Sequence, residues 1–243
     1  MLVSESDSEK KLVQLKGLLS LDKPDLERCG LLLRELNIDF LDKTFLPIVD
    51  ETKLTELHLA RDVLECGAIW CILKEDHQCF NRYMAQLKHF YFDLKQHLPT
   101  SPRQYEIIGA HLLNLLSQNR VPDFHSELEL LDCASLHNNR FLAYPVLLEQ
   151  YIVEGRTNKA FFEACQNPPT PYYAFFSRIL ENTTRRNMAV CIEMSFTCIP
   201  KEDVKRIFFT DDDQFIEELV AERHWILEKE KAFSYATELE RII

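Results

Sequence analysis

One segment of this chain carries two apolar stripes at once. Between Thr52 and Leu73, apolar side chains recur at helical spacing on two sides of the same predicted helix. They are Leu57, Ala60, Leu64, Ala68 and Cys71 on one side, and Leu59, Val63, Cys66, Trp70 and Leu73 on the other. A helix that is apolar on two sides is buried between neighbours on both. Gly67 lies between the stripes and predicts a close approach of another element there.

The stretch RYMAQLKHFYFDL, from Arg82 to Leu94, has the same character with larger side chains. One helical face carries Phe80, Tyr83, Leu87, Phe90 and Leu94, and Met84, Tyr91 and Phe92 widen it. This face could be a partner groove, but apolar residues at helix spacing are more often core. Consecutive helices that are each buried on several sides are typical of a helical repeat, in which hairpins stack on one another.

The remaining sequence favours a predominantly all-α fold. Gly is scarce, at 5 of 243 residues, which argues against glycine-rich phosphate loops, dinucleotide-binding folds and hairpin-rich β folds. Further helices are expected at about 8–20, from about 24, at 104–118, after 121, at 145–154 and at 158–164. The hairpins recur roughly every 40 residues, a spacing in the range of tetratricopeptide-like (TPR-like) arrays.

Turn signals separate these helices. Connections are predicted at residues 37–50, which include Pro47, and at residues 137–140. Two helix starts are predicted from capping residues that precede a proline: Asp22 before Pro24, and Thr170 before Pro171.

The C-terminal part has a different layout. A long helix is expected to run to about Phe196, with a break near 182–184. Two short helices follow, the first with Val204, Ile207 and Phe208 facing inward, and then two short extended pieces around a charged turn. This order predicts a winged helix, a relative of the helix-turn-helix. The domains expected are a helical-repeat domain at 1–175, a winged helix at 176–236 and a short tail at 237–243.

Charge argues against nucleic acid and anionic membranes as partners. The formal net charge is −11, and the closest approach to a basic patch is the pair Arg185 and Arg186. The second helix of the winged helix carries acidic residues at 211, 212, 213, 217, 218 and 222, opposed only by Arg223. Such a face is repelled by phosphates, so the winged helix is predicted to bind proteins. No signal peptide or membrane span is expected, and the cytoplasm and nucleus are the predicted location.

Chemistry-bearing residues form no recognisable active site. Cys66, Cys71, His77 and Cys79 lie near one another without zinc-ligand spacing, and buried core cysteines are the better interpretation. A catalytic cysteine–histidine pair could form between Cys133 or Cys165 and His125 or His137. However, no basic cluster is present in the sequence to lower the pKa of these thiols. Glu127 and Glu129 are two residues apart on a predicted helix and point in different directions, so they do not form a general acid/base pair. His111 is expected to be a partly buried, hydrogen-bonded core residue. We therefore expect no enzyme activity, no cofactor and no metal.

Several segments resemble the PCI-domain subunits of the proteasome lid. They are LARDVLECGAIW, RYMAQLKHFYFDL, LLSQNRVPDFHSELELL and EQYIVEG, within a resemblance that runs from about Leu12 to Phe233. It implies a PCI module that begins near residue 70, and a non-catalytic scaffold role in ubiquitin-dependent degradation. The implied partners are the other PCI and MPN subunits of the lid, in a hetero-oligomer. One departure is the short connection between KAFS and the apolar ending YATELERII.

The predicted partner surface comprises the winged helix and the apolar ending. Its candidate residues are Trp225, Ile226, Leu227, Phe233, Tyr235, Leu239, Ile242 and Ile243. Pairing of a partner with an edge strand, through WIL or AFS, is the expected mode of contact. The alternatives are a PCI subunit of the COP9 signalosome or of translation initiation factor three, and an acidic helical-repeat adaptor that acts outside any large complex.

Overall fold

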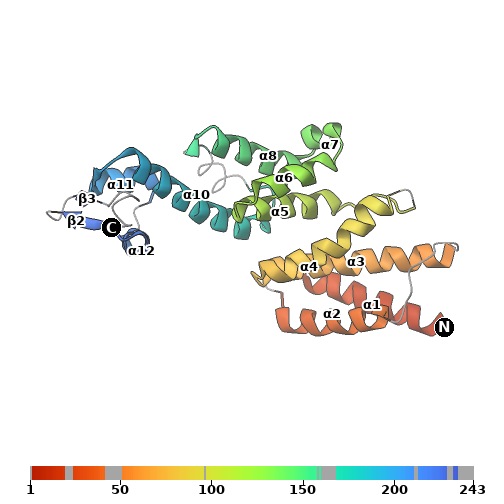
Figure 1. Cartoon of the computed structure of the whole chain (residues 1–243). Helices are drawn as coiled ribbons and strands as arrows, with labels where there is room; N and C mark the ends of the chain where they lie inside the picture. Colours follow the sequence, from red (N-terminus) through yellow and green to blue (C-terminus); the bar gives the residue numbers. More distant parts are fainter. Residues whose placement is uncertain are drawn as a thin grey trace.

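The computed structural model describes residues 2–19, 24–41, 51–95, 97–157, 159, 168–210, 213–228 and 232–234. Its helices are α1 (Leu2–Leu19), α2 (Leu26–Leu41), α3 (Glu51–Leu73), α4 (His77–Lys88), the π-helical turn η1 (His89–Asp93), α5 (Gln104–Ser117), α6 (Val121–Glu129), α7 (Cys133–Asn138), α8 (Arg140–Val153), α10 (Tyr173–Ser195), α11 (Lys201–Phe208) and α12 (Asp213–Arg223). Short strands β1 (Cys198–Pro200), β2 (Ile226–Glu228) and β3 (Ala232–Ser234) accompany the last helices. The elongated helical array ends in a small mixed module, which confirms the predicted fold class (Figure 1).

Helix α3 is the centre of the N-terminal layer. It packs against α1 and α2 on one side and against α4 and α5 on the other. Val63 and Cys66 share a core with leucines of α1 and α2, whereas Cys71 shares a core with Phe80 of α4. The two apolar stripes are therefore each buried, as predicted.

The aromatic stretch on α4 and η1 is mainly core. Phe80 and Leu87 are fully buried, and Phe90 and Tyr91 are both buried in the π-helical turn. The ring of Tyr83 lies against Gly67, where an added Cβ would come within 2.5 Å of Tyr83 Cε1. The predicted close approach at Gly67 is confirmed, and the neighbour is an aromatic ring of α4.

A buried polar cluster fixes the connection between η1 and α5 to α3. Tyr91 Oη donates a hydrogen bond to Glu65 Oε1 and Ser101 Oγ donates one to Glu65 Oε2, each at 2.9 Å. Arg61 donates to the carbonyl oxygen of Pro99 at 2.6 Å. Burial raises the pKa of the Glu65 carboxyl, although the two hydroxyl donors act in the opposite direction.

Helix α5 is the core of the second layer. Its residues from Ile107 to Ser117 are all buried, and it packs against α6, α8 and α10. At Gly109 an added Cβ would lie 2.1 Å from Tyr173 Oη and 2.4 Å from the carbonyl oxygen of Phe141. Tyr173 Oη donates to the carbonyl oxygen of Glu106 at 2.9 Å, which holds the start of α10 against α5.

His111 is buried in this layer, as expected. Its Nδ1 has no hydrogen-bond partner among the described residues, so the expectation of a hydrogen-bonded ring is wrong for that atom. Burial lowers the pKa of the imidazole to about 3, and the positive charges of Lys88 and Arg120 act in the same direction.

This histidine is expected to make the folded chain about 2 kcal/mol less stable at pH 5 than at pH 7.5. The unfolded imidazole binds a proton below about pH 6.5, whereas the folded one does so only near pH 3. Stability therefore falls as pH falls through 6.5. Urea unfolding of wild type and His111→Gln at both pH values measures the effect. The comparison between the two proteins separates the effect of His111 from that of Glu65. The raised pKa of Glu65 changes stability in the opposite direction, because it favours the folded chain as pH falls. An identical pH dependence in both proteins would contradict the assignment.

The C-terminal module is a winged helix. The second half of α10 leads into β1, α11 and α12, and the strands form an antiparallel sheet in the order β1-β3-β2. In register, Ser234 of β3 lies between Cys198 of β1 and Ile226 of β2. The sequence predicted the two helices and the hairpin but missed β1. Ile199 precedes Pro200, and the residue before a proline favours extended backbone, so a signal for β1 was present.

The start of α2 and the segment that follows it differ from the prediction. α2 continues to Leu41, through residues that were expected to be a connection. At its start, Asp25 Oδ1 accepts a hydrogen bond from the backbone N–H of Arg28 at 3.2 Å. Asp22 and Pro47 lie outside the described residues.

The predicted loop at 137–140 is wrong. Helices α7 and α8 are separated only by Asn139, whose side-chain oxygen accepts a hydrogen bond from the backbone N–H of Phe141 at 3.0 Å. One capping asparagine therefore replaces a loop. Most of the helix expected at 158–164 lies outside the described residues.

Helix α10 begins later than predicted and is continuous. Thr170 does not cap it: the helix begins at Tyr173, and Thr170 Oγ1 is buried without a described partner. No break occurs near 182–184, where Thr184 Oγ1 donates to the carbonyl oxygen of Leu180 at 2.8 Å. Because α10 contributes to both the second layer and the winged helix, a continuous helix joins them. The predicted domain boundaries stay predictions.

Candidate protein-interaction site

A compact core holds the winged helix against the end of α10. Its buried residues are Ala189, Ile192, Ile199, Val204, Phe208, Ile216, Leu219 and Trp225. The Trp225 side chain is 5% exposed, its Nε1 donates to Glu193 Oε1 at 2.7 Å, and its ring centroid lies 6.5 Å from that of Phe208. Trp225 therefore anchors β2 in the core. The structure does not place it on the surface, where the sequence-based prediction had put it.

Among the residues that the structure describes, the sheet of the winged helix has one unpaired edge strand without a proline, β2. β3 lies between β1 and β2, so both of its sides are occupied and it cannot add a partner strand. This excludes AFS as the edge and leaves WIL, whose Ile226 and Leu227 belong to β2. The other edge, β1, contains Pro200, which has no backbone N–H to donate. The β2 edge is thus the better template for a partner strand.

Exposed side chains lie at both edges of the sheet. Ile226 of β2 is 62% exposed, and Cys198 of β1, across β3 in the same row of the sheet, is also exposed. Met194 and Phe196, at the junction of α10 and β1, are 79% and 53% exposed. We call Met194, Phe196, Cys198 and Ile226, together with the β2 edge, the wing surface. The sequence-based list contained only Ile226 of these four residues, because it missed β1.

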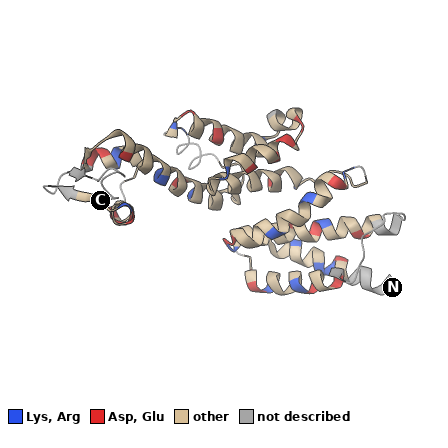
Figure 2. Ribbon diagram, in the orientation of Figure 1, with Lys and Arg blue, Asp and Glu red and all other residues tan. Residues whose placement is uncertain are grey.

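The acidic character of α12 is retained on its exposed face. Glu217, Glu218 and Glu222 are exposed, and Arg223 is turned back toward α10. Its guanidinium donates to the carbonyl oxygen of Arg186 at 3.4 Å and lies 4.0 Å from Glu193 Oε2. Figure 2 shows basic and acidic residues interspersed along the helices. An acidic α12 opposes contact with a phosphate backbone.

The other predicted interface residues are placed only in part. Leu227 and Phe233 occupy directly opposed positions in the β2–β3 ladder. Tyr235, Leu239, Ile242 and Ile243 lie outside the described residues, as does the predicted tail. Their roles stay predictions.

Cys66, Cys71 and Glu127, which the sequence raised as candidate reactive groups, take part in core packing or ion pairing. Burial raises the pKa of the Cys66 thiol to about 11 and raises that of Cys71 as well, so both are poor nucleophiles. Glu127 forms an ion pair with Lys88, and His125 lies 3.3 Å from Glu149. Cys165 lies outside the described residues. Within the described residues, no group of three or more His, Cys, Asp or Glu side chains is arranged to hold a metal ion.

The helices that the structure describes include none with the length and apolarity needed to cross a membrane.

Stacked helical hairpins that end in a winged helix with an open strand edge and an acidic second helix define a PCI-type scaffold protein. A family model confirms this class: the CSN8/PSMD8/EIF3K family matches residues 102–241, and the chain belongs to this family.

Curated relatives extend the similarity to nearly the whole chain. The chain is 32% identical to the 26S proteasome non-ATPase regulatory subunit 8 homolog A of Arabidopsis thaliana, over 91% of this chain and 92% of the relative. It is 29% identical to the 26S proteasome regulatory subunit RPN12 of Saccharomyces cerevisiae, over 88% and 81%. It is 33% identical to the 26S proteasome non-ATPase regulatory subunit 8 of Caenorhabditis elegans, over 74% and 70%. The resemblance to proteasome subunits is therefore confirmed.

Proposed function

We propose that this chain is a non-catalytic scaffold subunit in the lid of the 26S proteasome regulatory particle. The observation that carries the proposal is the similarity to proteasome regulatory subunits across most of the chain, at about 30% identity. The fold supports it, because stacked hairpins and a winged helix offer large surfaces for contact with other proteins. Its partners would be other lid subunits, of the PCI and MPN types, and its location the cytoplasm and nucleus.

The wing surface is the contact that we assign to this role. A partner strand added to β2 would form main-chain hydrogen bonds with it. The contact would also bury the exposed apolar side chain of Ile226. The acidic face of α12 favours a protein partner over a nucleic acid. A signalosome or initiation-factor subunit of the same build is less well supported, because the relatives described above carry proteasome names.

Replacing Ile226 with lysine is expected to lower incorporation into the particle at least about tenfold, which corresponds to about 1.4 kcal/mol. The change places a charge at the centre of the proposed contact. Since Ile226 is 62% exposed, the free energy of unfolding should change by less than about 0.5 kcal/mol. Quantitative mass spectrometry of particles purified through another subunit measures incorporation, and urea unfolding measures stability.

The matched control is Val153→Lys, because Val153 is 68% exposed on α8 and lies outside the wing surface. The control should be incorporated like wild type. Equal incorporation of both variants would remove the wing surface from the account, while the similarity to proteasome subunits would stand.

A further inference from the structure

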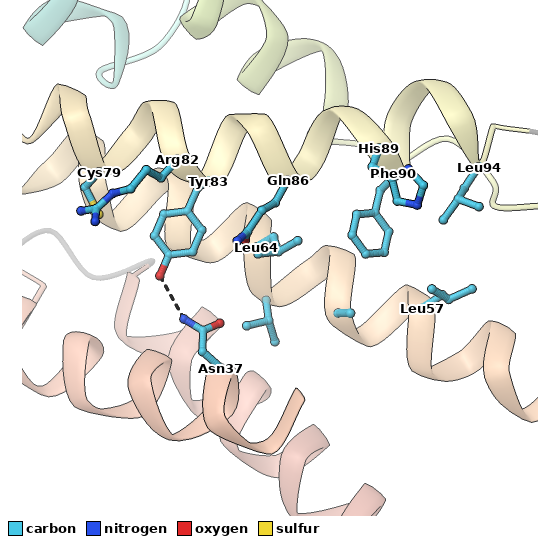
Figure 3. A pocket seen from close by; sticks show the side chains of 12 residues that line it. Asn37, Leu57, Leu64, Cys79, Arg82, Tyr83, Gln86, His89, Phe90 and Leu94 are labelled. Atoms are coloured by element: carbon cyan, nitrogen blue, oxygen red, sulfur yellow. Dashed lines mark hydrogen bonds between the residues drawn. The ribbon is translucent and has the colours of Figure 1, made fainter. Parts of the chain in front are cut away.

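A groove runs between α2 and α4, with α3 as its floor (Figure 3). One cavity of about 670 Å³ lies beneath α4, and a second of about 640 Å³ continues along α2. Both cavities are lined by Asn37 and Tyr83, and Asn37 Nδ2 donates to Tyr83 Oη at 3.2 Å. This bridge crosses the groove and marks the boundary between its two parts.

The lining is mainly apolar and reaches the surface. Leu57 and Phe90 are buried side chains that line the first cavity (Figure 3), and the half-buried Trp70 lines the second. On the α2 wall, Leu31 and Ile38 are 62% and 55% exposed. Large apolar side chains that stay exposed beside a hollow of this size mark an interaction site.

The charged rim is basic in a chain whose net charge is −11. Arg34 projects from α2 and Arg82 from α4, and both are exposed. Neither guanidinium forms an ion pair with any residue that the structure describes. His89, half exposed, also lines the first cavity, and Glu27 is the acidic residue among the two linings. The two arginines stand on opposite walls, where they would flank an occupant that carries carboxylates.

We propose that this groove binds an amphipathic helix of a partner protein, with leucine-sized side chains facing α3 and acidic side chains facing Arg34 and Arg82. The α4 and η1 residues along the first cavity run from Cys79 to Leu94, which is about 22 Å at the rise of an α-helix. That length suits about four helical turns, enough for apolar anchors at i, i+3, i+4 and i+7. The site lies at the end of the array opposite to the winged helix, so it is separate from the wing surface (Figure 1).

The test is site-specific photo-crosslinking in the complex purified from cells through a tag on the full chain. Benzoylphenylalanine replaces Gln86, which lines the groove, or Ala85, which is exposed on the same helix and lines neither cavity. The crosslinked peptide is then mapped by mass spectrometry. We expect position 86, and not position 85, to label one segment of another subunit, with apolar residues at helical spacing and flanking Asp or Glu.

Charge reversal adds a second readout. The double variant Arg34→Glu and Arg82→Glu should lower the crosslink yield from position 86 about tenfold. The control is Arg28→Glu with Arg140→Glu, which makes the same charge change at exposed arginines outside both cavities. Circular dichroism of each variant verifies that it is folded.

Any of five results would overturn the proposal. The crosslink could map to residues 42–50 of the same chain, to a second copy, or to a segment without acidic residues. The other two are the absence of a product and a crosslink yield that the charge reversal does not change. None of these results bears on the proposed function, which the subunit composition of the purified complex reports separately.

Discussion

Gly109→Ala is expected to lower the free energy of unfolding by about 2–3 kcal/mol, although alanine is the better helix former. The new methyl group would lie 2.1 Å from Tyr173 Oη and 2.4 Å from the carbonyl oxygen of Phe141. The second of these neighbours is backbone, so α8 itself has to move away from α5. The hydrogen bond from Tyr173 to Glu106 would be lost in the same movement. Urea unfolding followed by far-ultraviolet circular dichroism measures the change.

The same substitution at Gly17 is the control. Gly17 lies in α1, and an added Cβ there would meet nothing within 4 Å. Gly17→Ala should therefore stabilise the chain, by up to about 1 kcal/mol, through helix propensity alone. If both variants shift stability in the same direction, the packing of α5, α8 and α10 described here is incorrect.

Phe208→Ala is expected to lower the local free energy of unfolding of the winged helix by about 3–4 kcal/mol and to abolish incorporation into the particle. Phe208 is fully buried and packs beside Trp225 in a core of few residues, so little surrounding structure can close the cavity. Hydrogen exchange of amides in β1, α11 and β2 should accelerate at least about a hundredfold. Exchange in α3 and α5 should change little.

The adjacent residue supplies the matched control. Phe209 is 45% exposed and ends α11 in the left-handed region at φ 50°. Phe209→Ala should change stability by less than about 1 kcal/mol and leave incorporation intact. Equal damage from both substitutions would show that the winged-helix core is not organised around Phe208.

Periodicity was enough to predict the two-sided burial of α3 and the core role of the aromatic stretch. Both are properties of a single helix, and the spacing of its own apolar residues contains them. The prediction of a winged helix succeeded for the same reason, since two short amphipathic helices and a hairpin are local patterns. Strand β1 was missed because three residues offer no period, and its pairing partner β3 lies more than 30 residues away.

Caps and surface positions were harder to predict. Thr170 is a threonine directly before a proline, which is a capping signal, yet the packing of Tyr173 on α5 determines where α10 begins. Trp225 was expected at an interface because it belongs to WIL, a predicted edge strand, but its burial depends on Glu193 and Phe208, which are distant in sequence. Only the fold reveals that Arg223 turns away from the exposed face of α12, or that Arg34 of α2 and Arg82 of α4 line adjoining cavities of one groove.

The most direct test of the central claim is purification of the tagged chain from cells, followed by quantitative mass spectrometry of its stoichiometric partners. A scaffold subunit of the lid should co-purify with the other subunits of the 26S regulatory particle in near-equal amounts. Recovery of the chain as a free monomer, or in equal amounts with signalosome or initiation-factor subunits, would contradict the account.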